Sequence, residues 1–191
     1  MSEESVEAYT LISREGLPGT LEGNGSHGCI ELTTAYQAPS TLLVVVHKVK
    51  NLPHKSGRVP NPYVKLYLLS TGLKELKEES THVVENTDNP EYETTFAFPL
   101  TKPLSEYILR VCAKTKHKRP HYLGQVVLCF APFKSGKKVR ERAWYDLADP
   151  KKDYVICFVG YKDNVKGISL SNDRTDDVES SSESESEEDT V

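Results

Sequence analysis

The sequence predicts an all-β protein, an eight-stranded antiparallel β-sandwich, and two observations support this fold class. Short runs rich in β-branched, aromatic and other apolar residues recur along the middle of the chain. Turn-forming residues separate these runs, as in Ser70-Thr71-Gly72 and Thr87-Asp88-Asn89-Pro90. No long helical pattern interrupts them, and many short strands joined by turns are typical of two packed antiparallel sheets.

The turns locate the first five expected strands. Ala38-Pro39-Ser40 separates the first two strands, and a polar loop ending in Asn61-Pro62 precedes the third. Ser70-Thr71-Gly72 closes the third strand, and Thr87-Asp88-Asn89-Pro90 separates the fourth from the fifth. These five strands are expected at residues 29–36, 41–49, 62–69, 80–85 and 92–98.

The remaining strands follow the same pattern. A basic loop divides strand 106–113 from strand 122–130, and Ser135-Gly136 precedes strand 143–147. The apolar run 154–161 predicts a ninth strand; it also resembles the opening strand of a second, truncated copy, but too little chain follows to close another sandwich. Core positions are expected at Val44, Tyr63, Leu66, Phe96, Leu109 and Val127.

Charge divides the chain into three parts. Residues 1–28 carry five acids and one arginine, a net charge of −4, and are expected to form a flexible acidic arm. Residues 29–161 carry twenty bases and thirteen acids, a net charge of +7, and form the expected globular domain. Residues 162–191 carry ten acids and three bases, and we expect a disordered acidic tail rich in Ser and Glu. A basic domain between acidic arms favours anionic partners.

The sequence also indicates a cytoplasmic protein. No apolar run approaches the roughly 20 residues that span a bilayer, and the acidic N-terminus does not resemble a secretory signal. Cys29, Cys112, Cys129 and Cys157 each lie in an apolar run without paired metal-ligand spacing, which predicts reduced core thiols. In the tail, four serines each precede an acid by three residues and are candidates for phosphorylation: Ser180, Ser182, Ser184 and Ser186.

An ordered set of motifs resembles the C2 domain of synaptotagmin type. The set includes Val44-Val-Val-His47, Asn61-Pro-Tyr-Val-Lys65, Asn89-Pro90, Leu123-Gly124 and Trp144-Tyr-Asp-Leu147, and it covers about residues 28–150. It is most similar to the C-terminal C2 domains of extended synaptotagmins, with synaptotagmin-like Rab effectors as a second candidate. The resemblance implies a β-sandwich whose three loops gather at one end and dock on membranes.

Calcium-binding members of this family place five aspartates in those loops. The matching positions in this sequence are Lys55, Asn61, Ala113, Thr115 and His121. None of the five is a carboxylate, whereas calcium takes six to eight oxygen ligands, several of them carboxylates. We therefore expect no metal site in these loops and no cofactor.

Fixed positive charge replaces the acids. The first loop carries Lys55 and Arg58, and the third loop, within Ala113–Gly124, carries Lys114, Lys116, Lys118 and Arg119. These six residues are the predicted contacts for anionic phospholipid or phosphoinositide. The alternative is an ordinary solvated loop, because charge is common on protein surfaces.

Two other regions bear on lipid binding. Family members often bind lipid through a lysine-rich fourth strand, but here Glu78, Glu79 and Ser80 occupy places that are often basic, which argues against that site. A second basic cluster, expected at the opposite end of the domain, consists of Lys134, Lys137, Lys138, Arg140 and Arg142.

The predicted function is calcium-independent binding to anionic membranes in trafficking or tethering, by a peripheral membrane protein. The alternative is an adaptor that binds protein partners without lipid. We find no catalytic constellation and predict no enzyme activity. Nucleic acid is not an expected partner, because the basic loop lacks the aromatic platforms that single strands favour. We expect a monomer, or one part of a larger tether.

Overall fold

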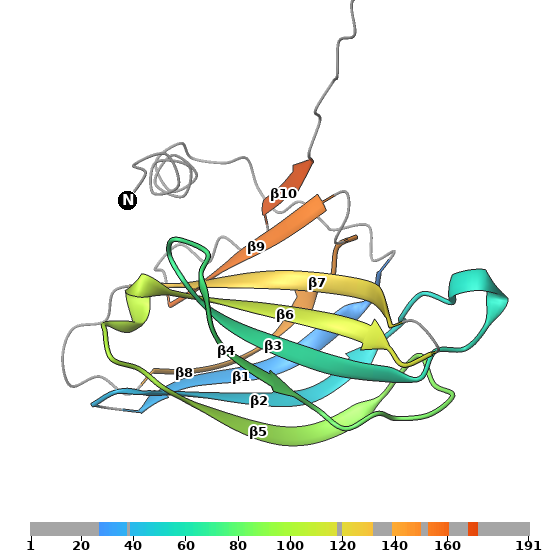
Figure 1. The fold of residues 1–191 in the computed structure, drawn as a ribbon, viewed down its shortest axis with the longest axis horizontal. Coiled ribbons are helices and arrows are strands. Elements are labelled where there is room, and N and C mark those ends of the chain that lie inside the picture. The colour runs from blue at the N-terminus through green and yellow to red at the C-terminus, as the bar shows by residue number, and fades with distance from the viewer. Residues whose placement is uncertain are drawn as a thin grey trace, which may run out of the picture.

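The computed structural model describes residues 27–37, 39–117, 120–131, 139–149, 153–160 and 168–171. These residues form two facing sheets, one with strand order β5-β2-β1-β8 and one with order β10-β9-β7-β6-β3-β4 (Figure 1). The first sheet contains β1 (Cys29–Gln37), β2 (Thr41–Lys50), β5 (Glu91–Pro99) and β8 (Val139–Asp146). The second contains β3 (Pro62–Ser70), β4 (Glu75–Ser80), β6 (Tyr107–Thr115), β7 (His121–Phe130), β9 (Asp153–Val159) and β10 (Ile168–Ser171).

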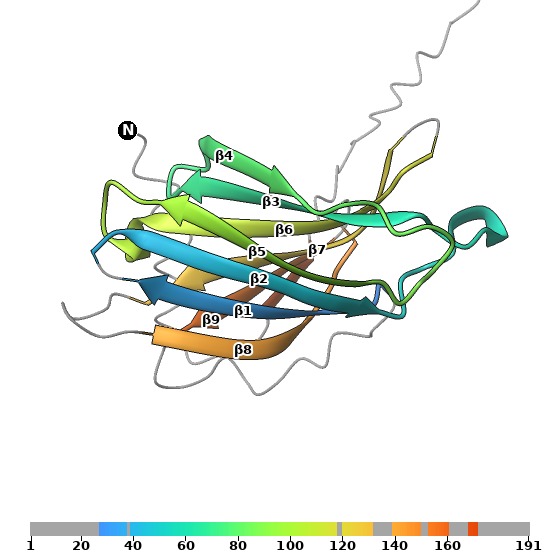
Figure 2. The same cartoon turned by 90° about the horizontal axis from the view of Figure 1, so that it is seen from below.

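The two-sheet sandwich confirms the predicted fold class. Every strand pair between β1 and β8 is antiparallel, and the turned view in Figure 2 shows β5, β2, β1 and β8 side by side. Helix is limited, in the described part of the chain, to two turns of 3-10 type, η1 (Lys55–Gly57) and η2 (Leu104–Glu106). Neither is long enough to cross a bilayer, and no described helix meets that requirement.

The fourth strand lies earlier in the chain than the sequence predicted. We expected residues 80–85, whereas β4 spans Glu75–Ser80 and pairs with β3. The backbone N–H groups of Thr81 and Val84 still bond β3, each at 2.9 Å. The Thr81 hydroxyl, however, accepts the N–H of Val64, so a side chain replaces one rung of the ladder and regular pairing stops there.

The end of the chain adds two strands to the second sheet. The predicted ninth strand is confirmed as β9. It pairs with β7 in parallel, whereas we expected a purely antiparallel sandwich. Strand β10 was not predicted from the sequence; it pairs with β9 and lies inside the segment expected to be disordered. The eighth strand also begins earlier than predicted, because β8 pairs with β1 from Val139 onward.

The core lies between the two sheets. Of the predicted core residues, Val44, Leu66 and Leu109 are fully buried there, and Phe96 is partly buried against the same cluster. Tyr63 is only half-buried, because its neighbour Val64 faces inward and successive side chains of a strand alternate. Val127 belongs to a second cluster of β3, β6, β7 and β9 residues: Tyr67, Leu69, Ile108, Cys112, Val127 and Ile156.

The buried carboxylate of Glu31, in the first sheet, makes the stability of the protein depend on pH in the acid range. Arg142 Nε on β8 donates a hydrogen bond of 2.9 Å to Glu31 Oε1 on β1, and Lys48 Nζ lies 3.9 Å from Oε2. The hydrogen bond from Arg142 holds the pKa of Glu31 below its ordinary value of 4.5. A carboxylate that is more acidic when folded stabilises the protein above its unfolded pKa, and this contribution is lost as pH falls through the folded value.

We therefore expect Glu31→Gln to flatten the acid limb of the stability profile. The variant should have a lower free energy of unfolding than the parent at about pH 7, and it should lose less on acidification to about pH 3. Urea titrations at several pH values measure both. Glu75→Gln, which removes an exposed carboxylate on β4, is the control and should retain the parent's slope. Parallel profiles for parent and Glu31→Gln would contradict the assignment.

Candidate functional site

Three loops converge at one end of the sandwich, which we call the tip. They are the β2–β3 loop (51–61, containing η1), the β4–β5 loop (81–90) and the β6–β7 loop (116–120, described except for 118 and 119). Figure 1 shows the β2–β3 loop projecting at the right-hand end. Backbone hydrogen bonds of 3.0 Å from Leu52 N to Asp88 O and from Thr87 N to Pro60 O join the first two loops.

Asn61 connects all three loops. Its backbone N–H donates to Thr115 Oγ1 at 2.9 Å, and its carbonyl accepts the N–H of Lys116 at 2.9 Å. Its side-chain oxygen accepts the N–H of Asn86 at 2.8 Å. A single residue therefore bonds to the β6–β7 side of the tip twice and to the β4–β5 loop once.

Two further side chains fasten the β2–β3 loop. Lys55 Nζ donates to the backbone carbonyl of Tyr122 at 2.6 Å, which ties this loop to the start of β7. His54 Nε2 lies 2.9 Å from Asp88 Oδ2 in the β4–β5 loop, and the hydrogen bond from His54 lowers the pKa of Asp88. The tip is thus ordered by groups that belong to the chain itself.

A pocket of about 530 Å³ opens between the first and third loops. Its lining is made of two fixed cations, two histidines, one hydroxyl and two apolar residues: Lys55, Arg58, His117, His121, Thr115, Pro60 and Leu123. Pro60, Leu123 and Thr115 are buried, and the charged side chains stand at the exposed side. Among the described residues, no carboxylate lines this pocket, and neither Lys55 nor Arg58 forms an ion pair.

The structure shows where the five positions that match calcium ligands in the family lie. Lys55, Thr115 and His121 line the pocket, and Asn61 bonds directly to Thr115. Ala113 is fully buried in the core cluster. Within the described part of the chain, no group of three or more His, Cys, Asp or Glu residues could hold a metal ion. The residues present offer this pocket nitrogen donors instead of carboxylate oxygens.

The structure separates the six predicted lipid contacts. Lys55 and Arg58 line the pocket, and Lys116 is exposed at the start of the third loop. Lys114 lies on β6, where its neighbours Ala113 and Thr115 point inward, so it faces the outer side of the sheet. Lys118 and Arg119 lie outside the described residues.

Lys114 belongs to a group around Tyr67 on the outer face of the second sheet. Lys114 Nζ donates to the Tyr67 hydroxyl at 3.1 Å, and the Arg110 guanidinium lies 4.6 Å from the Tyr67 ring centroid. Burial lowers the pKa of Lys114. Hydrogen bonds with the hydroxyls of Tyr67 and Tyr122 raise this pKa by a larger amount, so the net shift is upward. This group was not predicted from the sequence, because the expected strand ended at residue 113; β6 continues to Thr115, and alternation along it places Lys114 and Arg110 on one face.

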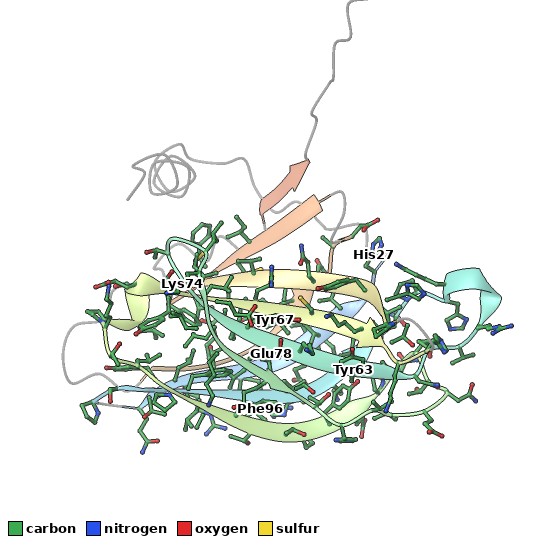
Figure 3. The ribbon with its side chains drawn as sticks, in the orientation of Figure 1. His27, Tyr63, Tyr67, Lys74, Glu78 and Phe96 are labelled. Carbon is green, nitrogen blue, oxygen red and sulfur yellow. The ribbon has the colours of Figure 1, made fainter. Side chains whose placement is uncertain are left out.

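The same face carries Glu78, one of the acids that argued against a fourth-strand lipid site, whereas Glu79 alternates to the other face of β4. Lys65 Nζ forms an ion pair with Glu78 Oε1, and the hydrogen bond to Glu78 raises the pKa of Lys65. Figure 3 shows Tyr67 and Glu78 close together over the middle of the sheet. Glu78 therefore neutralises one of the three cations on this face.

The second predicted basic cluster is only partly described. Lys134, Lys137 and Lys138 lie outside the described residues, as do the phosphorylation candidates Ser180, Ser182, Ser184 and Ser186. Arg140 and Arg142 lie on β8, and Arg142 is already paired with Glu31. No clustering of these five residues is therefore established.

The family model, the curated relatives and the solved structures all show similarity to C2 domains. The model of the C2 domain matches residues 40–147. Extended synaptotagmin-2-A of Xenopus laevis is 31% identical over 158 residues, which cover 78% of this chain and 18% of that protein. Extended synaptotagmin-2 of Mus musculus is likewise 31% identical, over 69% of this chain and 16% of its own length. The chain thus spans less than a fifth of these relatives.

Solved structures support the fold. The solution structure of the third C2 domain of KIAA1228 protein is 29% identical and superimposes with a TM-score of 0.56, covering 71% of this chain and 96% of that domain. A C2 domain of RIM from Drosophila is 23% identical with a TM-score of 0.53, covering 63% of this chain and 98% of that domain. The second likeness concerns the fold alone.

Proposed function

Because this chain belongs to the C2 domain family, related to membrane-trafficking proteins, we propose that it binds anionic membrane surfaces through its tip and does so without calcium. The targets are phospholipid or phosphoinositide headgroups, and the setting is trafficking or tethering at the cytoplasmic side of a membrane. We propose a binding role and no catalytic one. The names of the relatives, extended synaptotagmins, support this setting.

The observation that carries the proposal is the tip pocket, whose described lining has two permanent cations and no carboxylate. Calcium-dependent docking uses a metal ion to cancel loop acids, whereas here no acid at those positions needs cancelling. Lys116 adds a third exposed cation beside the pocket. Each Lys or Arg near an anionic leaflet contributes about 1 kcal/mol, so these three contribute about 3 kcal/mol at most. Glu85 and Asp88 in the β4–β5 loop of the same tip reduce that figure by repulsion.

Contact at the surface is expected to be shallow. The described tip exposes only two sizeable apolar side chains, Val59 at 37% and Tyr122 at 39%. Electrostatic attraction between exposed charges falls off over a Debye length of about 8 Å at physiological ionic strength. Binding should therefore weaken steeply with added salt, as adsorption does and deep insertion does not.

Vesicle sedimentation tests the proposal. The protein should sediment with vesicles of phosphatidylcholine and phosphatidylserine, equally well with a chelator or with added calcium, and it should stay in solution with pure phosphatidylcholine. A requirement for calcium would contradict the proposal. Absence from both pellets at low salt would also contradict it and would favour an adaptor that binds protein partners.

A further inference from the structure

We propose that the tip pocket is a specific site for a phosphate monoester, the dianionic group carried by a monoester lipid headgroup such as that of phosphatidic acid. The inference rests on the proposed function, because it names the headgroup chemistry that the tip would select. The pocket contains more unused hydrogen-bond donors than a surface that merely attracts negative charge would need.

The donors come from three kinds of side chain. The Lys55 ammonium has three N–H groups and uses one on the Tyr122 carbonyl, which leaves two. Arg58 presents a guanidinium with five N–H donors and no ion-pair partner among the described residues. The Thr115 hydroxyl oxygen accepts the N–H of Asn61, so its own O–H remains to donate. The rings of His117 and His121 complete the polar lining.

The charge of this lining fits a monoester better than a diester. A phosphate monoester carries about −1.5 to −2 charges near neutral pH and three terminal oxygens that accept hydrogen bonds. Two fixed cations, with no carboxylate among the described lining residues, match that charge. A phosphodiester group has one negative charge and two such oxygens, so by itself it would leave part of the donor set unused. Guanidinium groups pair with phosphate through two parallel hydrogen bonds, which adds geometric selectivity.

The size and floor of the pocket indicate how the headgroup would sit. At about 530 Å³ the pocket falls in the range of small-molecule sites and exceeds the needs of a phosphate group alone. Leu123 and Pro60 provide an apolar floor, against which the carbon atoms next to the phosphate can pack. The site therefore suits a phosphate attached to a glycerol or polyol rather than a bare inorganic ion.

The walls are positioned before any ligand arrives. Asn61 ties the β2–β3 loop to Thr115 and to Lys116, and Lys55 ties it to Tyr122. These loops are therefore ordered when the protein folds, so a ligand does not have to order them on binding, which favours affinity. Lys55 has two roles here, because it holds the pocket wall and also faces the ligand. Arg58 has no structural hydrogen bond from its side chain among the described contacts, so it is the cleaner residue to test.

The first arm of the test uses soluble headgroups and the intact chain. We expect sn-glycerol 3-phosphate, a monoester, to cause saturable NMR shifts of the backbone amides at Thr115 and His121. sn-Glycero-3-phosphoserine, a diester, should bind at least tenfold more weakly. Arg58→Gln should weaken the monoester by about tenfold, whereas Lys74→Gln should not. Lys74 is an exposed lysine at the opposite end of the domain (Figure 3).

The second arm uses vesicles that contain phosphatidic acid or phosphatidylserine, mixed to equal zeta potential. Preference for phosphatidic acid, abolished by Arg58→Gln but kept by Lys74→Gln, supports a lipid source of the phosphate. Monoester shifts without a vesicle preference support the pocket with a soluble phosphate ester as its ligand. No monoester shifts and equal binding to both vesicles would overturn the site while leaving the proposed function intact. Binding to neither vesicle defeats the proposed function.

Discussion

Lys55→Glu combined with Arg58→Glu is expected to abolish vesicle binding, with a loss of affinity of at least 100-fold at low salt. The double variant removes two cations from the tip pocket and places two carboxylates there. At about 1 kcal/mol for each cation lost and a similar repulsion for each acid gained, the change approaches about 4 kcal/mol. Lys55→Glu also removes the bond to the Tyr122 carbonyl, which loosens the β2–β3 loop. Sedimentation with phosphatidylserine vesicles over a lipid titration measures the loss.

A matched double variant separates tip charge from total charge. Lys74→Glu with Lys102→Glu makes the same change in net charge at the other end of the sandwich, where both lysines are exposed. Lys102 forms only a surface ion pair with Glu106, which contributes about 0.5 kcal/mol or less. Thermal denaturation confirms that each variant is folded. Equal losses of affinity in the two double variants would contradict binding through the tip.

Gly28→Ala is expected to lower the free energy of unfolding by about 3 kcal/mol or more. Gly28 has φ of +81°, in the left-handed region that non-glycine residues rarely adopt. An added Cβ would stand 2.3 Å from the carbonyl oxygen of Lys50 and 2.9 Å from that of Asn51, and both are backbone atoms. The Gly28 carbonyl also accepts the N–H of Leu147, so any shift disturbs the junction of β1, β2 and β8.

The control for this prediction is Gly72→Ala in the β3–β4 turn. An added Cβ there would meet only Ser70 Oγ at 3.7 Å, an ordinary contact, so the change should stay within about 1 kcal/mol. Chemical denaturation of both variants and the parent gives the comparison. Equal stability of Gly28→Ala and the parent would show that the backbone at Gly28 can relax, contrary to the geometry.

Most of the fold could be predicted because the strands have a simple apolar pattern. Val44, Leu66 and Leu109 repeat the inward face of their strands, and the structure buries all three. The fourth strand was misplaced because its residues, Glu75–Ser80, are polar apart from the exposed Leu76 and lie at the edge of the sheet, where no core pattern marks them. The parallel pairing of β9 with β7 depends on contacts distant in sequence, and no local signal encodes it.

The tip was predictable in composition but not in geometry. The resemblance to C2 domains identified the first loop and its basic residues Lys55 and Arg58, and both line the pocket. Lys114 was assigned to the same group because loop membership was judged from sequence distance, although strand alternation directs it to the other side of β6. The bonds of Asn61 to Thr115 and Asn86 join segments far apart in the chain, so they become visible only when the fold is known.

Asn61 and Lys55 hold the loops of the tip in place, and this affects when the protein can bind a membrane. Loops that need an ion to set their shape respond to each rise and fall of that ion, whereas loops held by their own residues stay set throughout. On the proposed function, residence at a bilayer would then follow the local supply of headgroups rather than a second messenger. Kinases and phosphatases that make or remove lipid phosphate would then control binding, and the fraction of protein on the membrane would depend on their relative activities.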